Sequence, residues 1–481
     1  MTRQVSRWAV LAITLLAACL RLYHLGAQSL WFDEAFPVVV TRLPLKESLD
    51  GILTLGAYSP FFYLLLRPVT ALLGQSEFAY HLLSAFFGIL TVPLMYRVGA
   101  RWMGWSAGLL AALLLAVCPF HLLYSQDARM YTMMGFFSLA AMDQFERKLR
   151  GGGRWALLIV FSALAYLSHY AAIFMIYVQL VCLLPKLKQA QLFRRWFAAQ
   201  AMALLPLAPW MALNVITNWK TRALGIGWIP RPDWLTLPLT LWNFISGDTD
   251  TWNVAVLALA AVCGLVLARG VFVQFRENRF LLWWLFLPLA TNLAVSLRQP
   301  LYVDRYFAGS LPAYIFLLAA GATRWRSRWM QAAASLVLLG VMAWGVVRVV
   351  SGDPYFAKED WRGATAFIEA QVKADDAVAL EDYETVIGLS AYRTREWPRL
   401  VLRPGEESAL LDDAAARAPR VWLIWRSPRE SSHRLSKSEP FDVFTEATLP
   451  VRDWLSAHRN QVALDLRLPG LSVVRLDRER P

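Results

Sequence analysis

Two adjacent carboxylates near the start of the chain are the first side chains that could do chemistry. Residues 29–36 read SLWFDEAF and place Asp33 and Glu34 among three aromatic side chains. Partial burial against aromatic rings can raise the pKa of a carboxylate and make it a usable base. The simpler alternative is that both acids are solvated loop carboxylates or cap a helix.

A second polar cluster occupies residues 124–131, which read YSQDARMY. A short turn between two apolar helices needs only small or turn-forming residues, yet this one carries Asp127, Arg129 and Tyr131. These side chains could line a site for a polar ligand. The alternative is structural, with Asp127 capping a helix and Arg129 extending its side chain towards the membrane surface.

A third cluster lies in residues 296–307, SLRQPLYVDRYF, and contains Arg298, Asp304, Arg305 and Tyr306. An arginine fork fits the oxygens of a phosphate in a bidentate manner, so either arginine could bind an anionic partner. Alternatively, Arg305 forms a surface ion pair with Asp304, which would contribute little energy.

His169 and Tyr170, in the stretch LSHYAA, complete the candidates. A lone histidine is more often structural than catalytic, so these two side chains are expected only to line the site. The four clusters together offer carboxylates that could accept a proton and arginines that could stabilise a departing phosphate.

The composition is that of a membrane protein. Of the 481 residues, 57% are hydrophobic and only 17% are charged, whereas soluble domains are about one quarter charged. The net charge of +13 comes largely from loops between apolar segments and does not indicate nucleic acid binding. We therefore expect membrane lipids around the chain and no nucleic acid partner.

Eleven apolar segments approach the roughly 20 residues that a helix needs to cross a bilayer. They are residues 8–22, 78–96, 105–124, 130–145, 155–168, 170–185, 196–216, 252–268, 280–297, 306–323 and 329–350. Residues 58–74 are interrupted by Pro60, Arg67 and Pro68 and are expected to form a helix lying in the interface.

The distribution of lysine and arginine predicts the orientation. Alternate loops, such as FERKLRGGGR and PKLKQAQLFRR, are strongly basic, which places them and the N-terminus in the cytoplasm. Residues 1–28 form an uncleaved anchor rather than a signal peptide, because Arg21 interrupts the cleavage pattern. The four polar clusters, including the first external loop at 23–77, then share the extracytoplasmic face.

Charged residues return after residue 350, and the hydrophobic pattern changes. Two helical stretches, WRGATAFIEAQV and residues 383–392, alternate with the strand-like runs AVAL, RVWLIW, VALDL and LSVVRL. We expect residues 1–350 to form the transmembrane domain and residues 351–481 to form a small extracytoplasmic α/β domain.

The order LWFDEAF, YSPFFYLLLRPVTALLGQSEFAYHLLSAFFGIL and YSQDARMYTMM resembles the membrane glycosyltransferases of the GT-C fold. The resemblance is strongest to the family-39-like branch, which includes protein O-mannosyltransferases and the aminoarabinose transferase of lipid A. It covers about residues 8–216 and extends to YVDRYF. It implies a polytopic α-helical protein that takes a hexose or pentose from a polyprenyl-phosphate donor.

The resemblance also implies roles for individual residues. Asp33 corresponds to the first-loop acid thought to act as base or to position the acceptor, with Glu34 beside it. Asp127 corresponds to the acid of the second external loop. Arg305 or Arg298 corresponds to the arginine near the donor phosphate. The acceptor would be a glycan, lipid or protein outside the inner (plasma) membrane.

Two other readings and the question of a cofactor remain open on the sequence. A secondary transporter or flippase for a polar-headed lipid would place charges near the bilayer midplane, whereas the charges here gather at one surface. A non-enzymatic assembly protein would leave the acidic pair and YSQDARMY unexplained. The sequence indicates no certain cofactor, although Asp33 and Asp127 offer hard oxygens that could bind a divalent cation.

Overall fold

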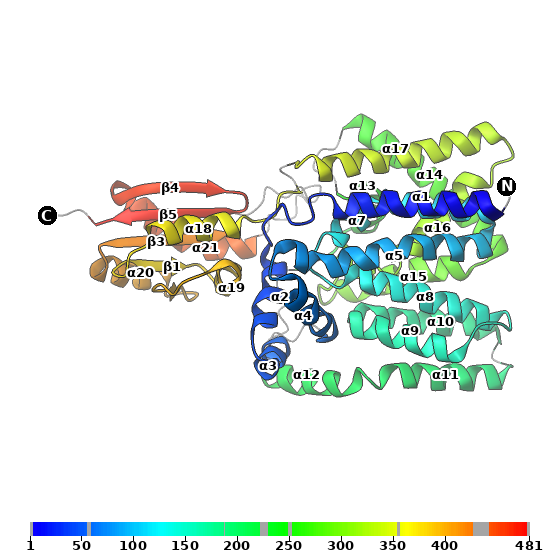
Figure 1. The fold of residues 1–481 in the computed structure, drawn as a ribbon, viewed down its shortest axis with the longest axis horizontal. Helices are drawn as coiled ribbons and strands as arrows, with labels where there is room; N and C mark the ends of the chain where they lie inside the picture. Colours follow the sequence, from blue (N-terminus) through cyan, green and yellow to red (C-terminus); the bar gives the residue numbers. More distant parts are fainter. Residues whose placement is uncertain are drawn as a thin grey trace. The chain divides into compact units, whose positions relative to one another are not determined.

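The computed structural model describes residues 3–54, 59–186, 188–221, 229–248, 253–353, 356–426 and 442–478. Tyr58, together with residues 222–228 and 249–251 of the predicted external loops, lies outside the described residues. The chain divides into two compact units (Figure 1). The first comprises residues 1–25, 46–74 and 79–351, and the second comprises residues 26–45, 75–78 and 352–481.

The first unit is built from helices (Figure 1). Its elements are α1 (Arg3–Leu22), α3 (Leu45–Thr54), α4 (Phe61–Leu73), α5 (Glu77–Met103), α6 (Trp105–Ala116), α7 (Pro119–Ser125), α8 (Tyr131–Leu149), α9 (Trp155–Ser168), η1 (Tyr170–Ile173), α10 (Phe174–Leu183), η2 (Leu184–Lys186), α11 (Ala190–Leu204), α12 (Ala208–Thr221), α13 (Thr236–Ser246), α14 (Val254–Glu277), α15 (Phe280–Ser296), η3 (Asp304–Phe307), α16 (Leu311–Thr323) and α17 (Arg328–Val350).

Each of the eleven apolar segments expected to span a membrane contains helix. Three helices, α5, α14 and α17, are long and apolar enough to cross a bilayer by themselves. Two bent pairs, α6 with α7 and α11 with α12, bring the number to five if each pair is one span. Other apolar helices, including α9, α15 and α16, are shorter, with 10–17 residues each. The predicted helix at 58–74 is present as α4.

Proline explains the position of both bends. The axes of α6 and α7 meet at 54°, and those of α11 and α12 at 59°. Pro119 is the first residue of α7, and Pro206 lies between α11 and α12. Proline has no N–H to donate and disfavours helical backbone in the preceding residue, which favours a break at these two positions. The two continuous spans predicted at 105–124 and 196–216 are therefore broken helices.

Two glycines allow α14 and α16 to cross in close contact. A Cβ atom added at Gly270 of α14 would collide with the carbonyl oxygen of Leu317, and one at Gly321 of α16 would collide with that of Val266. Small residues permit this approach where helices associate without a hydrophobic driving force.

The second unit contains α2 (Phe32–Arg42) and an α/β domain (Figure 1). The domain's elements are α18 (Trp361–Gln371), β1 (Ala377–Leu380), α19 (Tyr383–Tyr392), β2 (Leu400–Val401), α20 (Glu407–Arg417), β3 (Arg420–Arg426), α21 (Asp442–Ala457), η5 (Arg459–Gln461), β4 (Val462–Leu468) and β5 (Leu471–Asp477). The strand order is β2-β1-β3-β5-β4, with β2, β1 and β3 parallel and β5 and β4 antiparallel.

Both faces of the central strand are covered. Trp422 and Ile424 of β3 belong to one buried apolar cluster, and Leu423 and Trp425 belong to another. A strand buried on both faces has a continuous apolar sequence, which is why RVWLIW was recognisable. The predicted helical membrane fold with a small C-terminal sheet domain is confirmed.

Candidate functional site

The acidic pair lies in the first turn of α2, in the second unit. Both side chains are buried, Asp33 with 8% and Glu34 with 0% of its surface exposed. The Glu34 carboxylate accepts a hydrogen bond from the Trp31 N–H at 3.2 Å, which closes the start of the helix. The positive end of the helix dipole also favours carboxylates in a first turn. The geometry thus gives Glu34 the capping role that the sequence left open.

Glu34 also forms a buried ion pair. The Lys358 ammonium donates to both Glu34 carboxylate oxygens, at 2.7 and 2.8 Å. The Lys358 side chain is 18% exposed. A buried carboxylate needs a paired cation to offset its lost hydration, so Glu34 is held in place by structural contacts. Consecutive helical residues point in different directions, at 3.6 residues per turn, so Asp33 projects from another side of α2 than Glu34 does.

The segment that carries Lys358 holds the first loop at several further points. The Glu359 carboxylate accepts from the Phe32 N–H at 3.0 Å and pairs with the Arg426 guanidinium at 2.9 Å. That guanidinium lies 5.4 Å from the centre of the Phe32 ring. The Arg362 N–H donates to the Ser29 hydroxyl at 3.1 Å. These contacts explain why residues 26–45 belong to the same compact unit as the C-terminal residues.

The YSQDARMY turn lies in the first unit, between α7 and α8, and its charged side chains, Asp127 and Arg129, are buried. The Arg129 N–H donates to the Asp127 carbonyl at 2.7 Å, which makes the turn tight. The Arg129 guanidinium donates to the Tyr63 hydroxyl of α4 at 3.4 Å. The Ser84 hydroxyl of α5 donates to the Arg129 carbonyl at 2.7 Å. Burial excludes the proposal that Arg129 extends to a membrane surface.

Four aromatic rings connect this turn to two distant segments. The ring centres of Tyr124 and Tyr131 are 5.1 Å apart, those of Tyr131 and His169 are 5.6 Å apart, and those of His169 and Tyr306 are 5.1 Å apart. We call Tyr124, Tyr131, His169 and Tyr306 the ring cluster. It joins the turn before α8, the turn after α9 and η3, so three of the four predicted clusters meet in the first unit.

Two of the three arginines of the predicted site, Arg129 and Arg305, act on His169. Burial, followed by the charges of Arg129 and Arg305, lowers the pKa of His169 to about 3. The Nδ1 atom of this ring accepts a hydrogen bond from the Ala171 N–H at 3.1 Å. Because Nδ1 is the acceptor, the neutral ring carries its hydrogen on Nε2. His169 is therefore a neutral hydrogen-bonding group near two guanidiniums.

Two carboxylates accompany the arginines. Tyr124 of the ring cluster lies within electrostatic reach of Asp127, Asp304 and Arg305. The Asn243 amide of α13 donates to the Asp304 carboxylate at 3.0 Å. The Arg305 guanidinium lies 6.0 Å from the centre of the Tyr306 ring. The cluster thus combines two buried or half-buried cations, two acids and four rings, an arrangement suited to an anion that carries a polar group.

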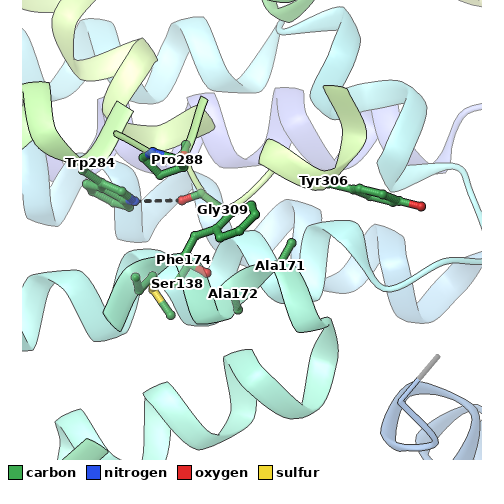
Figure 2. A pocket seen from close by; sticks show the side chains of 10 residues that line it. Ser138, Ala171, Ala172, Phe174, Trp284, Pro288, Tyr306 and Gly309 are labelled. Atoms are coloured by element: carbon green, nitrogen blue, oxygen red, sulfur yellow. Dashed lines mark hydrogen bonds between the residues drawn. The ribbon is translucent and has the colours of Figure 1, made fainter. Parts of the chain in front are cut away.

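A small pocket adjoins the ring cluster at Tyr306 (Figure 2). Its lining is largely apolar and comes from α8, η1, α10, α15 and the segment after η3: Ser138, Ala171, Ala172, Phe174, Met175, Trp284, Pro288, Tyr306, Gly309 and Ser310. The Trp284 indole N–H donates to the Gly309 carbonyl at 3.0 Å, as Figure 2 shows. An apolar space therefore lies directly beside the polar cluster.

Two predicted residues lie apart from the ring cluster. Arg298 is exposed, and within the described part of the chain no side-chain hydrogen bond or ion pair involves it. The Tyr170 hydroxyl accepts from the Trp210 indole of α12 at 3.1 Å. Asp33 and Glu34 belong to the second unit, so a pocket shared by Asp33 and Asp127 stays a prediction. Among the residues described, no three histidine, cysteine, aspartate or glutamate side chains gather as a metal site.

Sequence reasoning missed several members of the cluster. Tyr124 was visible as the first residue of YSQDARMY, but nothing distinguished it from an interfacial tyrosine. Tyr63 and Asn243 were hidden, one inside an apolar helix and the other inside α13, which had been expected to be loop. An uncharged amide in an apolar run, as in LTLWNFIS, is the only signal that could have identified Asn243.

The Glu34–Lys358 pair predicts a stability effect. Lys358→Met leaves Glu34 buried without a cation and should lower the free energy of unfolding of the second unit by about 3 kcal/mol. Lys358→Met combined with Glu34→Gln should cost less than Lys358→Met alone. Arg417→Met, which removes an exposed ion pair with Asp413, should cost at most about 0.5 kcal/mol. Thermal unfolding of the full chain in detergent, together with protease protection of residues 356–426, measures the loss of stability in each variant. Equal losses in Lys358→Met and Arg417→Met would contradict the prediction that the Glu34–Lys358 pair is the stronger one.

The lowered pKa of His169 predicts a pH dependence. The unfolded chain binds a proton at this residue below about pH 6.5, whereas the folded chain does so only near pH 3. His169 therefore favours the folded state above pH 6.5, and this contribution decreases as the pH falls towards 3. His169→Asn keeps an acceptor for the Ala171 N–H but does not titrate. Between pH 7.5 and 5, the melting temperature of the His169→Asn variant should fall less than that of the wild type. An equal fall in the two proteins would refute the prediction.

Comparisons with known proteins agree with this architecture. The sequence model of the family described as dolichyl-phosphate-mannose-protein mannosyltransferase matches residues 57–213, which is less than half of the chain. A sequence search of curated proteins found no match.

Solved structures resemble the whole chain. ArnT from Cupriavidus metallidurans in its apo state has a TM-score of 0.60 at 13% identity, with 97% of each chain covered. The same protein bound to undecaprenyl phosphate has a TM-score of 0.62 at 12% identity, with 98% of each chain covered. The apo oligosaccharyltransferase of Archaeoglobus fulgidus has a TM-score of 0.51 at 13% identity, covering 87% of this chain and 69% of its own. The resemblance to GT-C membrane proteins is therefore confirmed for the fold.

Proposed function

We propose that this chain is an integral-membrane glycosyltransferase. It takes a hexose or pentose from a polyprenyl-phosphate donor and transfers it to a lipid, polysaccharide or protein outside the plasma membrane. The observation that carries the proposal is the meeting of Arg129 and Arg305 around the ring cluster. The two guanidiniums come from segments far apart in sequence, and both act on His169.

The surroundings of this cluster fit a lipid-linked phosphate. Guanidiniums bind phosphate oxygens strongly because their hydrogen bonds are charge-assisted. The likeness to ArnT extends over nearly the entire chain, and one ArnT structure is bound to undecaprenyl phosphate.

The proposed reaction is an inverting displacement. The Asp33 carboxylate accepts the proton of the acceptor's hydroxyl or amine. The acceptor's electron pair forms a new bond to the anomeric carbon, and the bond from that carbon to the phosphate oxygen breaks. The polyprenyl phosphate leaves with the bonding electrons, and Arg129 and Arg305 stabilise its charge. Glu34 serves this step by capping α2 and binding Lys358 rather than by exchanging a proton.

The test uses the full chain in native membranes with undecaprenyl-phosphate donors carrying a hexose or a pentose. The wild type should consume one donor and release undecaprenyl phosphate. Asp33→Asn should lower this turnover by about 100-fold or more because it removes the base, without changing binding of undecaprenyl phosphate. Asp50→Asn, the same change at an exposed position of the first loop, should have no effect. Normal turnover by a folded Asp33→Asn variant would refute the role of Asp33.

The same assay separates transfer from transport. A flippase would move the donor across the bilayer without consuming it, so an unchanged donor that changes leaflet would overturn the glycosyltransferase proposal. A fluorescent polyprenyl-phosphate analogue in vesicles, quenched from one side, measures this movement directly.

The two arginines of SLRQPLYVDRYF should behave differently. Arg305 adjoins the ring cluster, whereas Arg298 is exposed. Arg305→Met should weaken binding of undecaprenyl phosphate by about tenfold or more, because a charge-assisted hydrogen bond to the phosphate is lost. Arg298→Met serves as the matched control and should leave the affinity within about twofold. A larger effect at Arg298 would assign the phosphate to another part of the protein.

A further inference from the structure

The broken helix before the YSQDARMY turn leaves a backbone group without its normal partner. In an unbroken helix the Leu115 carbonyl would accept from the N–H of the residue four positions later, which is Pro119 and has none. Among backbone donors of the described residues, the Cys118 N–H makes a long bond to the Leu115 carbonyl at 3.4 Å. The C-terminal end of α6 therefore requires a donor from another element.

Arg21, at the end of α1, supplies that donor. Its side chain is fully buried, with 0% exposed. The guanidinium donates to the Leu115 carbonyl at 3.1 Å and to the Ala116 carbonyl at 2.9 Å. It also bonds Nδ1 of His121 in α7 at 2.8 Å. A cation at the negative end of the α6 dipole is favourable, so one side chain bridges the two halves of the broken span.

A side chain of the YSQDARMY turn caps the C-terminal end of α1. The Gln126 amide donates to the carbonyls of Leu20 at 3.3 Å, Arg21 at 3.2 Å and Tyr23 at 2.8 Å. Leu20 and Arg21 belong to the last turn of α1 and Tyr23 directly follows it, so these are carbonyls that have no partner within the helix. Thus α1 caps α6 through Arg21, and the turn after α7 caps α1 through Gln126. The two caps are reciprocal and join the same elements.

The next residues of the turn carry the candidate chemistry. On the side away from Gln126, the Ser84 hydroxyl of α5 holds the Arg129 carbonyl, and the Thr132 hydroxyl donates to the Ser84 carbonyl at 2.8 Å. The turn is therefore fixed at both ends, by α1 at Gln126 and by α5 at Arg129. A shift at either end would displace the Arg129 guanidinium relative to Tyr131 and His169.

We propose that Arg21 and Gln126 are positioning residues that fix the YSQDARMY turn through reciprocal helix capping. They place Arg129 for the donor phosphate without contacting the donor themselves. The placement of Arg129 for the donor phosphate rests on the proposed function, whereas the helix capping is independent of any activity. The sequence did not indicate that Arg21 serves the site, because its only apparent significance was to interrupt a cleavage pattern.

The test compares full-length variants in nanodiscs by hydrogen–deuterium exchange and by binding of undecaprenyl phosphate. Arg21→Met removes the donors with little change in side-chain length, and Gln126→Glu removes the amide donor without changing shape. Both should increase exchange of residues 117–132 and weaken undecaprenyl phosphate binding by about tenfold. Arg21→Met combined with Arg129→Met should bind no more weakly than Arg129→Met alone, since both act through Arg129. Arg7→Met, an exposed arginine on the same helix, is the control.

Each outcome decides one question. Unchanged exchange in a folded Arg21→Met variant overturns the capping. Increased exchange with normal lipid affinity overturns the positioning role and leaves Arg21 purely structural. If the losses of lipid affinity in Arg21→Met and Arg129→Met add fully in the double variant, Arg21 does not act through Arg129. If Arg21→Met does not fold, the same exchange and lipid-binding measurements are made with Gln126→Glu, alone and combined with Arg129→Met. A wild type that does not bind undecaprenyl phosphate refutes the proposed function, whereas the exchange data still test the caps.

Discussion

A charged side chain buried among apolar helices must find its partners on other elements, and this requirement determines how both units of the protein are built. Removing a charge from water is offset only by close, well-directed polar contacts. Glu34 obtains them from Lys358, and Arg21 obtains them from two carbonyls of α6. Neither partner is near in sequence. The buried charges therefore act as long-range constraints on which segments meet.

This constraint gives the two members of the acidic pair different roles. A DE dipeptide suggests two equivalent carboxylates, yet Glu34 is committed to the start of α2 and to an ammonium group. Its neighbour Asp33 occupies a helix whose N-terminal turn, preceding loop and flanking segment are all held by residues between Lys358 and Arg362. The C-terminal domain is thus more than an appended module, because it contains the framework that fixes the acid-bearing helix.

Much of the fold could be predicted from the sequence because it depends on local pattern. Hydrophobic periodicity or apolar composition is enough to identify several elements from local sequence, namely the apolar spans, the strand RVWLIW and the helix at 361–371. The helices α13 and α20 were missed, one in a segment expected to be loop and the other in a polar, alanine-rich stretch. The bends at Pro119 and Pro206 were also missed, because a proline in an apolar run does not by itself mark a bend: Pro93 and Pro288 lie inside the continuous helices α5 and α15.

The candidate site was partly predictable for the same reason. The motifs YSQDARMY and YVDRYF stand out because charges are rare in such a chain, and the structure brings them together with His169. The sequence could not choose between Arg298 and Arg305, because that choice depends on whether η3 turns one guanidinium towards the ring cluster. Nor could it assign residues 26–45 to the C-terminal unit, since the contacts that do so join positions more than 300 residues apart.

The polar groups buried within the helical unit are of two kinds, and their positions differ. Between α8, α9, α10 and α11, Gln179 and Gln200 bind each other, with Tyr166 and Trp196 completing the set. These groups are neutral and satisfy one another, as expected for contacts that hold membrane helices together. The charged groups Asp127, Arg129, Asp304 and Arg305 lie instead in turns and at helix ends. The buried Arg21 follows the same pattern, because it lies at the end of α1 and binds the last carbonyls of α6 at the break before α7.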